Sequence, residues 1–173
     1  MSMSTNTFDL SEPEVTADDL LMLDDPHFGP NNVAVVTGAA SGIGQTTAVA
    51  LAANGLSVVG ADIDEDGLGE TVDLADDLDA PGTIHPVPTD LTDDDDVESM
   101  IDTAADHGEL RYVANIAGMQ HIASIPEFPM EKYDLLLDIM LRAPFLTAKL
   151  AMPHIRDTDD GVGAIGNMSS VHE

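Results

Sequence analysis

The stretch that decides the fold runs from Asn32 to Asp62 and reads NVAVVTGAASGIGQTTAVALAANGLSVVGAD. It opens with a short apolar, β-branched run, which is typical of a buried parallel strand. A glycine-rich loop follows at 37–44, and small and apolar residues then predict a helix that ends near Gly55. A second apolar strand, 56–61, leads directly to Asp62. Strand, loop, helix, strand and terminal acid in this order are typical of a dinucleotide-binding unit.

The glycines of the loop have physical roles in such a unit. Gly38, Gly42 and Gly44 allow a tight turn, close approach of the backbone to a pyrophosphate, and close packing of helix on strand. The phosphates are expected on the free N–H groups of the helix that starts near Gly42. Asp62 follows the loop at close to the ~20-residue spacing of the acid that binds the adenosine ribose. Residues 1–110 contain no Arg or Lys to receive a 2′-phosphate, so the sequence predicts NAD rather than NADP.

Beyond Asp62 the apolar pattern continues to alternate between strand and helix. It predicts strands at 83–91, 110–116 and 162–168, and helices at 93–107 and 131–155, the last with a kink at Pro144. Two prolines in the 83–91 strand place it at a sheet edge. Strands separated by helices indicate a parallel sheet with helices on both faces. We therefore expect a Rossmann-type, doubly wound α/β domain with strand order 3-2-1-4-5.

Composition narrows the possible partners. The net charge is −28, from 33 acidic residues against five lysines and arginines. Such a charge repels nucleic acid and anionic lipid, so neither is expected as a partner. The acidity can serve solubility alone, or it can be an adaptation to a salty cytoplasm that screens the repulsion. Because lysine is scarce along the whole chain, we favour the halophilic interpretation.

The ends and the environment of the chain are also suggested by composition. Residues 1–31 are polar, acidic and punctuated by proline, which predicts a mostly irregular extension before a domain at 32–173. No run of 18 apolar residues predicts a membrane span, and no basic-then-apolar start resembles a signal peptide. The chain has no cysteine, which fits a reducing compartment. We therefore expect a cytoplasmic protein.

The loop TGAASGIG at 37–44, followed by NIAG at 115–118, resembles the short-chain dehydrogenase/reductase family, whose patterns are TGxxxGxG and NNAG. Ile116 stands where the family has its second asparagine. The resemblance covers residues 32–173 and implies NAD as cofactor. The cofactor-binding residues that it implies are Thr37, Gly38, Ser41, Gly42, Ile43, Gly44, Asp62, Ile63, Asp90, Leu91, Asn115, Ala117 and Gly118.

Two further segments, GMQHI at 118–122 and SSVH at 169–172, resemble the branch of this family that oxidises D-3-hydroxybutyrate. The resemblance implies Ser170 as the catalytic serine, and Gln120 and His172 as ligands of the substrate carboxylate. Both side chains can donate hydrogen bonds to a carboxylate. The alternative is an ordinary surface glutamine and loop histidine. The implied reaction converts D-3-hydroxybutyrate to acetoacetate, with another small alcohol or sugar as the alternative substrate.

The chain departs from the family pattern in two ways. Met140 stands where the family has an active-site asparagine, and a thioether cannot donate a hydrogen bond. The family's Tyr-x-x-x-Lys follows the catalytic serine, but neither Tyr112 nor Tyr133 has a lysine four residues on. We therefore expect the first two-thirds of a longer dehydrogenase, truncated before that motif, with a sheet incomplete at its C-terminal side. The resemblance implies that the full-length protein is a homotetramer. The alternative to a truncated enzyme is a non-catalytic dinucleotide-binding chain.

A metal site is not predicted. The stretch from Asp62 to Gly67 imitates a calcium loop, but it follows a strand, and Asp73 would occupy its twelfth position. The six histidines show no metal-ligand spacing. Asp93–Asp96 is interpreted as the start of a helix, where the helix dipole favours acids.

Overall fold

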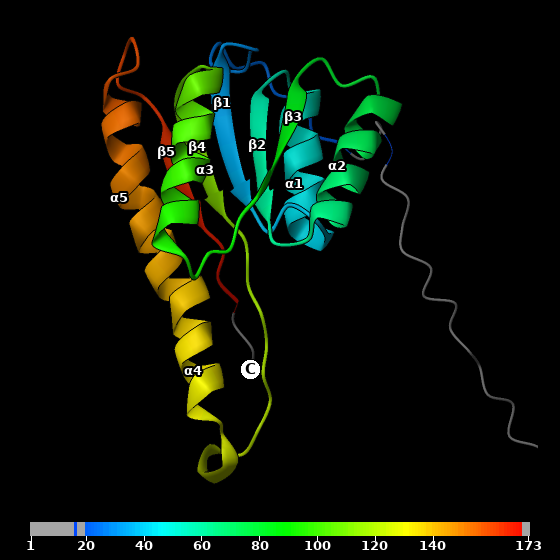
Figure 1. Cartoon of the computed structure of the whole chain (residues 1–173). Coiled ribbons are helices and arrows are strands. Elements are labelled where there is room, and N and C mark those ends of the chain that lie inside the picture. The colour runs from blue at the N-terminus through cyan, green and yellow to red at the C-terminus, as the bar shows by residue number, and fades with distance from the viewer. Residues whose placement is uncertain (1–15, 17–19, 171–173) are drawn as a thin grey trace, which may run out of the picture.

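A five-stranded parallel sheet forms the centre of the molecule (Figure 1). The computed structural model describes Thr16 and residues 20–170. The strands lie in the order β3-β2-β1-β4-β5, which confirms the Rossmann-type topology predicted from the sequence. Their bounds are β1 Asn32–Thr37, β2 Ser57–Asp62, β3 Thr83–Pro88, β4 Glu109–Asn115 and β5 Ala164–Asn167.

Helices connect the strands and cover both faces of the sheet (Figure 1). Side chains of β1 alternate between the two faces: Val33 and Val35 join one core, and Ala34 and Val36 join the other. Helices α3 and α5 cover the first core, and α1 and α2 cover the second. The helical bounds are α1 Gly42–Ala53, α2 Glu65–Asp77, α3 Asp94–His107, η2 Ile125–Glu127, α4 Met130–Leu137, η3 Asp138–Arg142 and α5 Ala143–Arg156.

The two edges of the sheet differ in burial. β3 is one edge, as its Pro86 and Pro88 predict, and it is shorter than the predicted 83–91 strand. β5 is the other edge, and three of its four residues are exposed. By contrast, five of the six residues of β1 and of β2 are buried. The sheet is therefore well covered at its centre and open along β5.

Helix α2 was not predicted from the sequence. Its aspartates and glycines have low helix propensity, which hides a helical pattern. Two features, one local and one tertiary, outweigh that propensity. The Asp64 carboxylate accepts a hydrogen bond from the Gly67 amide at 3.2 Å and so caps the helix, and Leu68 is buried in the sheet core.

The predicted helix 131–155 is divided into three parts. A π-helical turn, η3, separates α4 from α5, and the Ala143 amide donates to the Asp138 carbonyl, five residues back. Pro144 has no N–H to donate to the carbonyl of Met140, so the ordinary α-helical ladder cannot pass this point. The distortion predicted at Pro144 therefore lies in the turn just before it. In Figure 1, α4 projects past the carboxyl ends of the strands.

Residues 20–31 lie against the amino ends of the strands and contain no helical turn. The Leu23 amide donates to Asn54 Oδ1 at 2.7 Å, and Asn54 Nδ2 donates to the Leu21 carbonyl at 3.0 Å. Phe28 packs edge-on against Tyr112, with ring centroids 5.7 Å apart. The rest of the predicted extension, residues 1–15 and 17–19, lies outside the described residues. No helix in the described part of the chain is both long and apolar enough to cross a membrane.

Candidate active site

The glycine loop lies at the carboxyl ends of β1 and β4. Gly38 has a φ of +74°, and a Cβ there would lie 2.8 Å from Ala117 Cα. A Cβ on Gly44 would lie 1.9 Å from the Gly38 carbonyl oxygen. Neither position accepts a side chain, because the loop folds tightly on itself and packs directly on the segment after β4.

The amino end of α1 faces the same loop. Ser41 is its N-cap residue, but the serine side chain makes no capping hydrogen bond, and the first turn contains no acid. Ser41, Gly42 and Ile43 are all exposed. The first amides of the helix therefore keep their capacity to donate to an anion, and the helix dipole favours negative charge there.

A cavity of about 540 Å³ runs from this loop across the ends of β2 and β4. Eleven of the thirteen predicted cofactor residues line it: Gly38, Ser41, Gly42, Ile43, Gly44, Asp62, Ile63, Asp90, Leu91, Ala117 and Gly118. Its location is the point where the strand order reverses, which is where open α/β sheets bind their ligands. Five other lining residues were not predicted: Thr89, Ile116, Met119, Ile139 and Met168.

The two remaining predicted residues, Thr37 and Asn115, do not line this cavity. Both are buried. The Thr37 hydroxyl accepts hydrogen bonds from the amides of Ile116 and Ala117, at 3.0 and 3.2 Å, and so joins the ends of β1 and β4. Asn115 Nδ2 donates to Asn167 Oδ1 at 2.9 Å, which joins the ends of β4 and β5. In this structure Thr37 supports the first cavity from behind, whereas Asn115 lines the adjoining second cavity.

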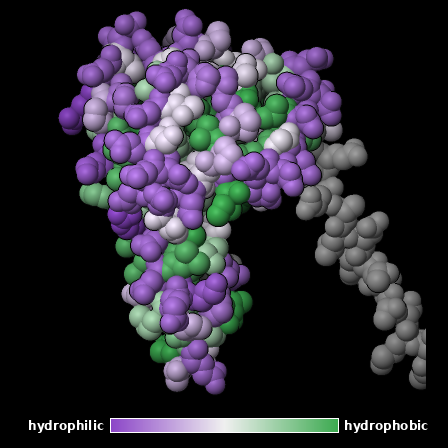
Figure 2. Space-filling view, viewed as in Figure 1, coloured by the Kyte–Doolittle hydropathy of each residue, from purple (hydrophilic) through white to green (hydrophobic). Residues whose placement is uncertain are grey.

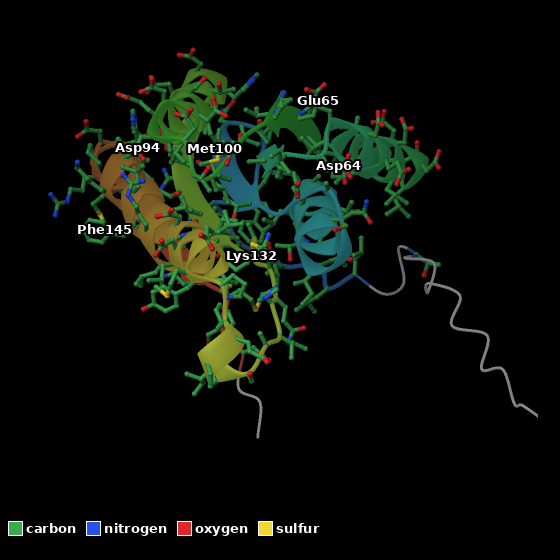
Figure 3. The ribbon with its side chains drawn as sticks, turned by 60° about the horizontal axis from the view of Figure 1, so that its bottom comes forward. Asp64, Glu65, Asp94, Met100, Lys132 and Phe145 are labelled. Carbon is green, nitrogen blue, oxygen red and sulfur yellow. The ribbon has the colours of Figure 1, made fainter. Side chains whose placement is uncertain are left out.

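The Asp62 carboxylate is fixed at the rim of the cavity by backbone amides. It accepts hydrogen bonds from the amides of Ala40 and Asp64, each at 3.1 Å. Asp64 and Glu65 at the start of α2, and Asp94 at the start of α3, lie at this same end of the molecule (Figure 3). A fixed anion with free lone pairs can accept from sugar hydroxyls and repels a phosphate.

Asp90 is a second carboxylate on the wall of the cavity. The Thr92 hydroxyl donates to it at 2.7 Å and the Thr92 amide at 2.9 Å, and these bonds lower the pKa of Asp90 below its usual value. The Asp90 amide in turn donates to Asp96 at 2.9 Å. Asp90 is therefore an anion with a defined orientation at neutral pH, available to ligand hydrogen-bond donors.

A second cavity, of about 500 Å³, adjoins the first and shares residues 116–119 and Met168 with it. The structure brings Gln120, Ser169 and Ser170 together on its lining, although they lie far apart in the sequence. Both serines line the cavity, so the geometry does not distinguish between them. His172, the other predicted substrate ligand, lies outside the described residues.

Two residues noted in the sequence behave differently from each other. His121 lies edge-on against Phe128, with centroids 5.2 Å apart, and lines neither cavity. Met140 lines the second cavity from the π turn.

The stretch that imitates a calcium loop forms the end of β2 and the cap of α2. Within residues 20–170 and Thr16, no cluster of three or more His, Asp or Glu side chains could hold a metal ion.

The sequence is similar to known oxidoreductases. The family model described as "short chain dehydrogenase" matches residues 32–173. A 3-oxoacyl-acyl-carrier-protein reductase of Thermotoga maritima is 29% identical over 140 residues, covering 80% of this chain and 55% of the relative. The D-beta-hydroxybutyrate dehydrogenase of Cupriavidus necator is 34% identical over 143 residues, covering 80% and 53%.

Solved structures show the same likeness. A metagenomic short-chain oxidoreductase in complex with NADP superposes with a TM-score of 0.74 at 27% identity, covering 83% of this chain and 64% of that one. A short-chain type dehydrogenase/reductase from Mycobacterium marinum superposes with a TM-score of 0.72 at 28% identity, covering 80% and 56%. The chain thus spans about half the length of the curated relatives it matches.

Proposed function

Because this chain belongs to the short-chain dehydrogenase family, we propose that it forms the cofactor site and one side of the substrate site of an NAD-dependent oxidoreductase. The proposed reaction is the oxidation of D-3-hydroxybutyrate to acetoacetate. The observation that carries the proposal is the pair of adjoining cavities. One combines a tight glycine loop with a fixed Asp62, and the other contains Ser170 and Gln120.

The preference for NAD rests on charge. Asp62 is held at the cavity rim, where it favours ribose hydroxyls over a 2′-phosphate. Among the described residues, no Lys or Arg lines the first cavity, so no cationic side chain there neutralises a 2′-phosphate. One structural neighbour is a complex with NADP, and NADP is therefore the alternative to be tested here.

Titration of the chain with NAD and with NADP tests this choice. We expect tighter binding of NAD, and Asp62→Ala should weaken NAD binding and reduce the difference between the two cofactors. Asp66→Ala is the matched control, because Asp66 is an exposed acid that lines neither cavity. Equal or tighter binding of NADP by the unsubstituted protein would contradict the proposal.

The chain's own residues account for part of the chemistry. A bound nicotinamide would supply the hydride acceptor. In this proposal the Ser170 hydroxyl, which lines the second cavity, hydrogen-bonds the substrate oxygen, and the Gln120 amide donates to the carboxylate. Neither group is a good base at neutral pH, so the proton of the alcohol needs a further acceptor. We propose that the Tyr-x-x-x-Lys implied by the family lies after residue 173, in a longer form of the protein.

An assay of NADH formation separates these roles. We expect residues 1–173 alone to show at best weak NAD binding and no measurable oxidation of 3-hydroxybutyrate. A chain extended through a Tyr-x-x-x-Lys segment should turn over, since a positioned acid–base group contributes about 10²–10⁴-fold. In the extended chain, Ser170→Ala should cripple turnover and Ser169→Ala should not. If the extended chain oxidises another small alcohol or sugar instead, the alternative substrate is favoured. If the extended chain is inactive, the alternative of a non-catalytic dinucleotide-binding chain is favoured.

Assembly belongs to the same proposal. The body of the molecule is mostly hydrophilic in Figure 2, whereas apolar groups gather on the projection below it. Exposed apolar side chains follow one another from η2 to α5: Ile125, Met130, Tyr133, Leu137, Leu141, Phe145 and Met152. Such a patch is unusual on a monomer. It supports a homo-oligomer, proposed to be a tetramer in the full-length form, and light scattering of that form tests it.

A further inference from the structure

The second cavity has an unusual number of methionines. Met119, Met140 and Met168, three of the nine in the chain, line it. They come from the loop after β4, the π turn and the segment after β5, so only the tertiary fold brings them together. Methionine is apolar, unbranched and adaptable, and it fits apolar groups of varied shape.

The rest of the lining is neutral. Its polar side chains are amides and hydroxyls: Asn115, Gln120, Asn167, Ser169 and Ser170. Ile116 and Pro144 add apolar surface beside the methionines. No Lys or Arg is among the described lining residues. The cavity therefore offers neutral hydrogen bonds for a polar group together with an apolar surface for the remainder of a ligand.

Met140 occupies a defined place in this lining. Its sulfur lies 3.6 Å from the position that a Cβ on Gly118 would take, so the side chain lies over the segment after β4. Arg142 of the same turn pairs with Asp94 through both nitrogens, one bond being 2.6 Å long, which fixes the turn on the start of α3. Met140 is 46% exposed, and it lines the second cavity but not the first.

We propose that the three methionines, here called the methionine wall, bind an unbranched alkyl group of the substrate, and that Met140 determines how its length affects binding. The substrate class is then a 3-hydroxy acid or related secondary alcohol with an alkyl chain longer than that of 3-hydroxybutyrate. This inference rests on the proposed function and extends its substrate range. Each additional buried methylene should tighten binding about fourfold.

Methyl NMR of the folded chain labelled with ¹³C at the methionine methyl groups tests the inference without needing turnover. Met119 and Met168 line both cavities, so saturating NAD should shift their signals. Adding 3-hydroxybutyrate, 3-hydroxyhexanoate and 3-hydroxyoctanoate in turn should then shift Met140 with increasing affinity. Met100, buried in the core, and Met152, outside both cavities, should stay unshifted.

Two substitutions separate an apolar role from a merely spatial one. In both variants the Met119 and Met168 signals report ligand binding, because the Met140 signal is lost. Met140→Leu keeps the apolar character and should retain the gain in affinity with chain length. Met140→Gln has similar length but a polar end, and it should abolish most of that gain. An unchanged Met100 signal reports that each variant keeps its fold.

The outcomes distinguish the two levels of the argument. If NAD shifts Met119 and Met168 but affinity does not rise with chain length, the cofactor site stands and the methionine wall is wrong. If the gain in affinity persists in Met140→Gln, Met140 does not determine how the length of the alkyl group affects binding, and the inference is also overturned. If NAD shifts none of the three methionines even in the extended chain, the proposed function itself fails.

Discussion

The two ends of the same parallel sheet are built from different chemistry. At the carboxyl end, glycines, amides and fixed acids surround cavities and leave hydrogen-bonding groups available. At the amino end, polar groups satisfy one another. Arg111 is buried and donates to Asp160 at 2.6 Å, to the Val162 carbonyl at 2.9 Å and also to Glu109. An end that binds ligands keeps its donors free, whereas an end without ligands can use them for stability.

The amino end is also where the first described residues attach. His27 lies 3.1 Å from Asp25 through Nδ1 and 2.8 Å from Asp160 through Nε2. Hydrogen bonds from Arg111, and then from His27, hold the pKa of Asp160 well below its usual range. The segment before β1 and the turn before β5 are thus joined through one carboxylate. This network at the amino end, formed by His27, Glu109, Arg111 and Asp160, is called the amino-end network below.

The largest expected effect is at the carboxyl end. Gly44→Val should abolish NAD binding and strongly destabilise the fold, because its Cβ would lie 1.9 Å from the Gly38 carbonyl oxygen. Gly69→Ala is the matched control, since nothing lies within 4 Å of its Cβ and alanine favours a helix by about 0.5–1 kcal/mol. Cofactor titration and thermal unfolding measure both. A Gly44→Val chain that still binds NAD would show that the loop is not the phosphate site.

A second effect concerns the whole acidic surface rather than either end. Repulsion among 33 acidic residues should loosen the fold at low ionic strength, and molar KCl should restore it by screening. Circular dichroism during thermal unfolding, from low to multimolar KCl, gives the dependence. A melting temperature that stays flat across this range would remove the halophilic interpretation.

A third change breaks the amino-end network alone. Arg111→Met should lower the free energy of unfolding by about 2 kcal/mol, because it leaves partly buried acceptors unpaired. This corresponds to roughly 4–8 °C in melting temperature for a chain of this size. NAD affinity should stay the same, since the site is at the opposite end. Arg156→Met, which removes the same charge from an exposed position, is the control. A large loss of NAD affinity in Arg111→Met would mean that the two ends are coupled.

The smallest expected effect is a pH dependence near the amino end. The ring of His85 on β3 stacks on His107, the last residue of α3, with centroids 3.6 Å apart, and its Nε2 lies 3.0 Å from Ser57 Oγ. Burial, and secondarily the facing charge of His107, lowers the pKa of His85. Below about pH 6.5 the unfolded chain therefore takes up a proton that the folded chain resists. The free energy of unfolding should then decrease as the pH is lowered.

Urea unfolding at pH 7.5 and at pH 5.5 measures this effect. His107→Gln should reduce the loss of stability between the two values, because it removes the charge that opposes protonation of His85. His154→Gln, on α5, should leave the loss unchanged. An identical pH dependence in His107→Gln and the original chain would show that His107 does not contribute to the lowered pKa of His85.

Much of the architecture was predictable because it depends on local patterns. The alternation of strands and helices, the strand order and the edge position of β3 follow from apolar runs, glycine and proline. Helix α2 was missed because its composition is poor for a helix. The cap formed by Asp64 and the burial of Leu68 stabilise the helix nevertheless. The π turn was also missed, although Pro144 predicted a distortion at that place.

The sequence by itself determined that a glycine loop, a helix start and Asp62 would meet at one sheet end, because strand direction and loop length permit little else. Only the tertiary structure showed that Thr37 supports the first cavity from behind and that Asn115 lines the second, since their hydrogen-bond partners lie in segments distant in the sequence. It alone brought the methionine wall together and formed the amino-end network. Contacts between residues distant in sequence depend on how helices pack across a sheet, and no local pattern carries that information.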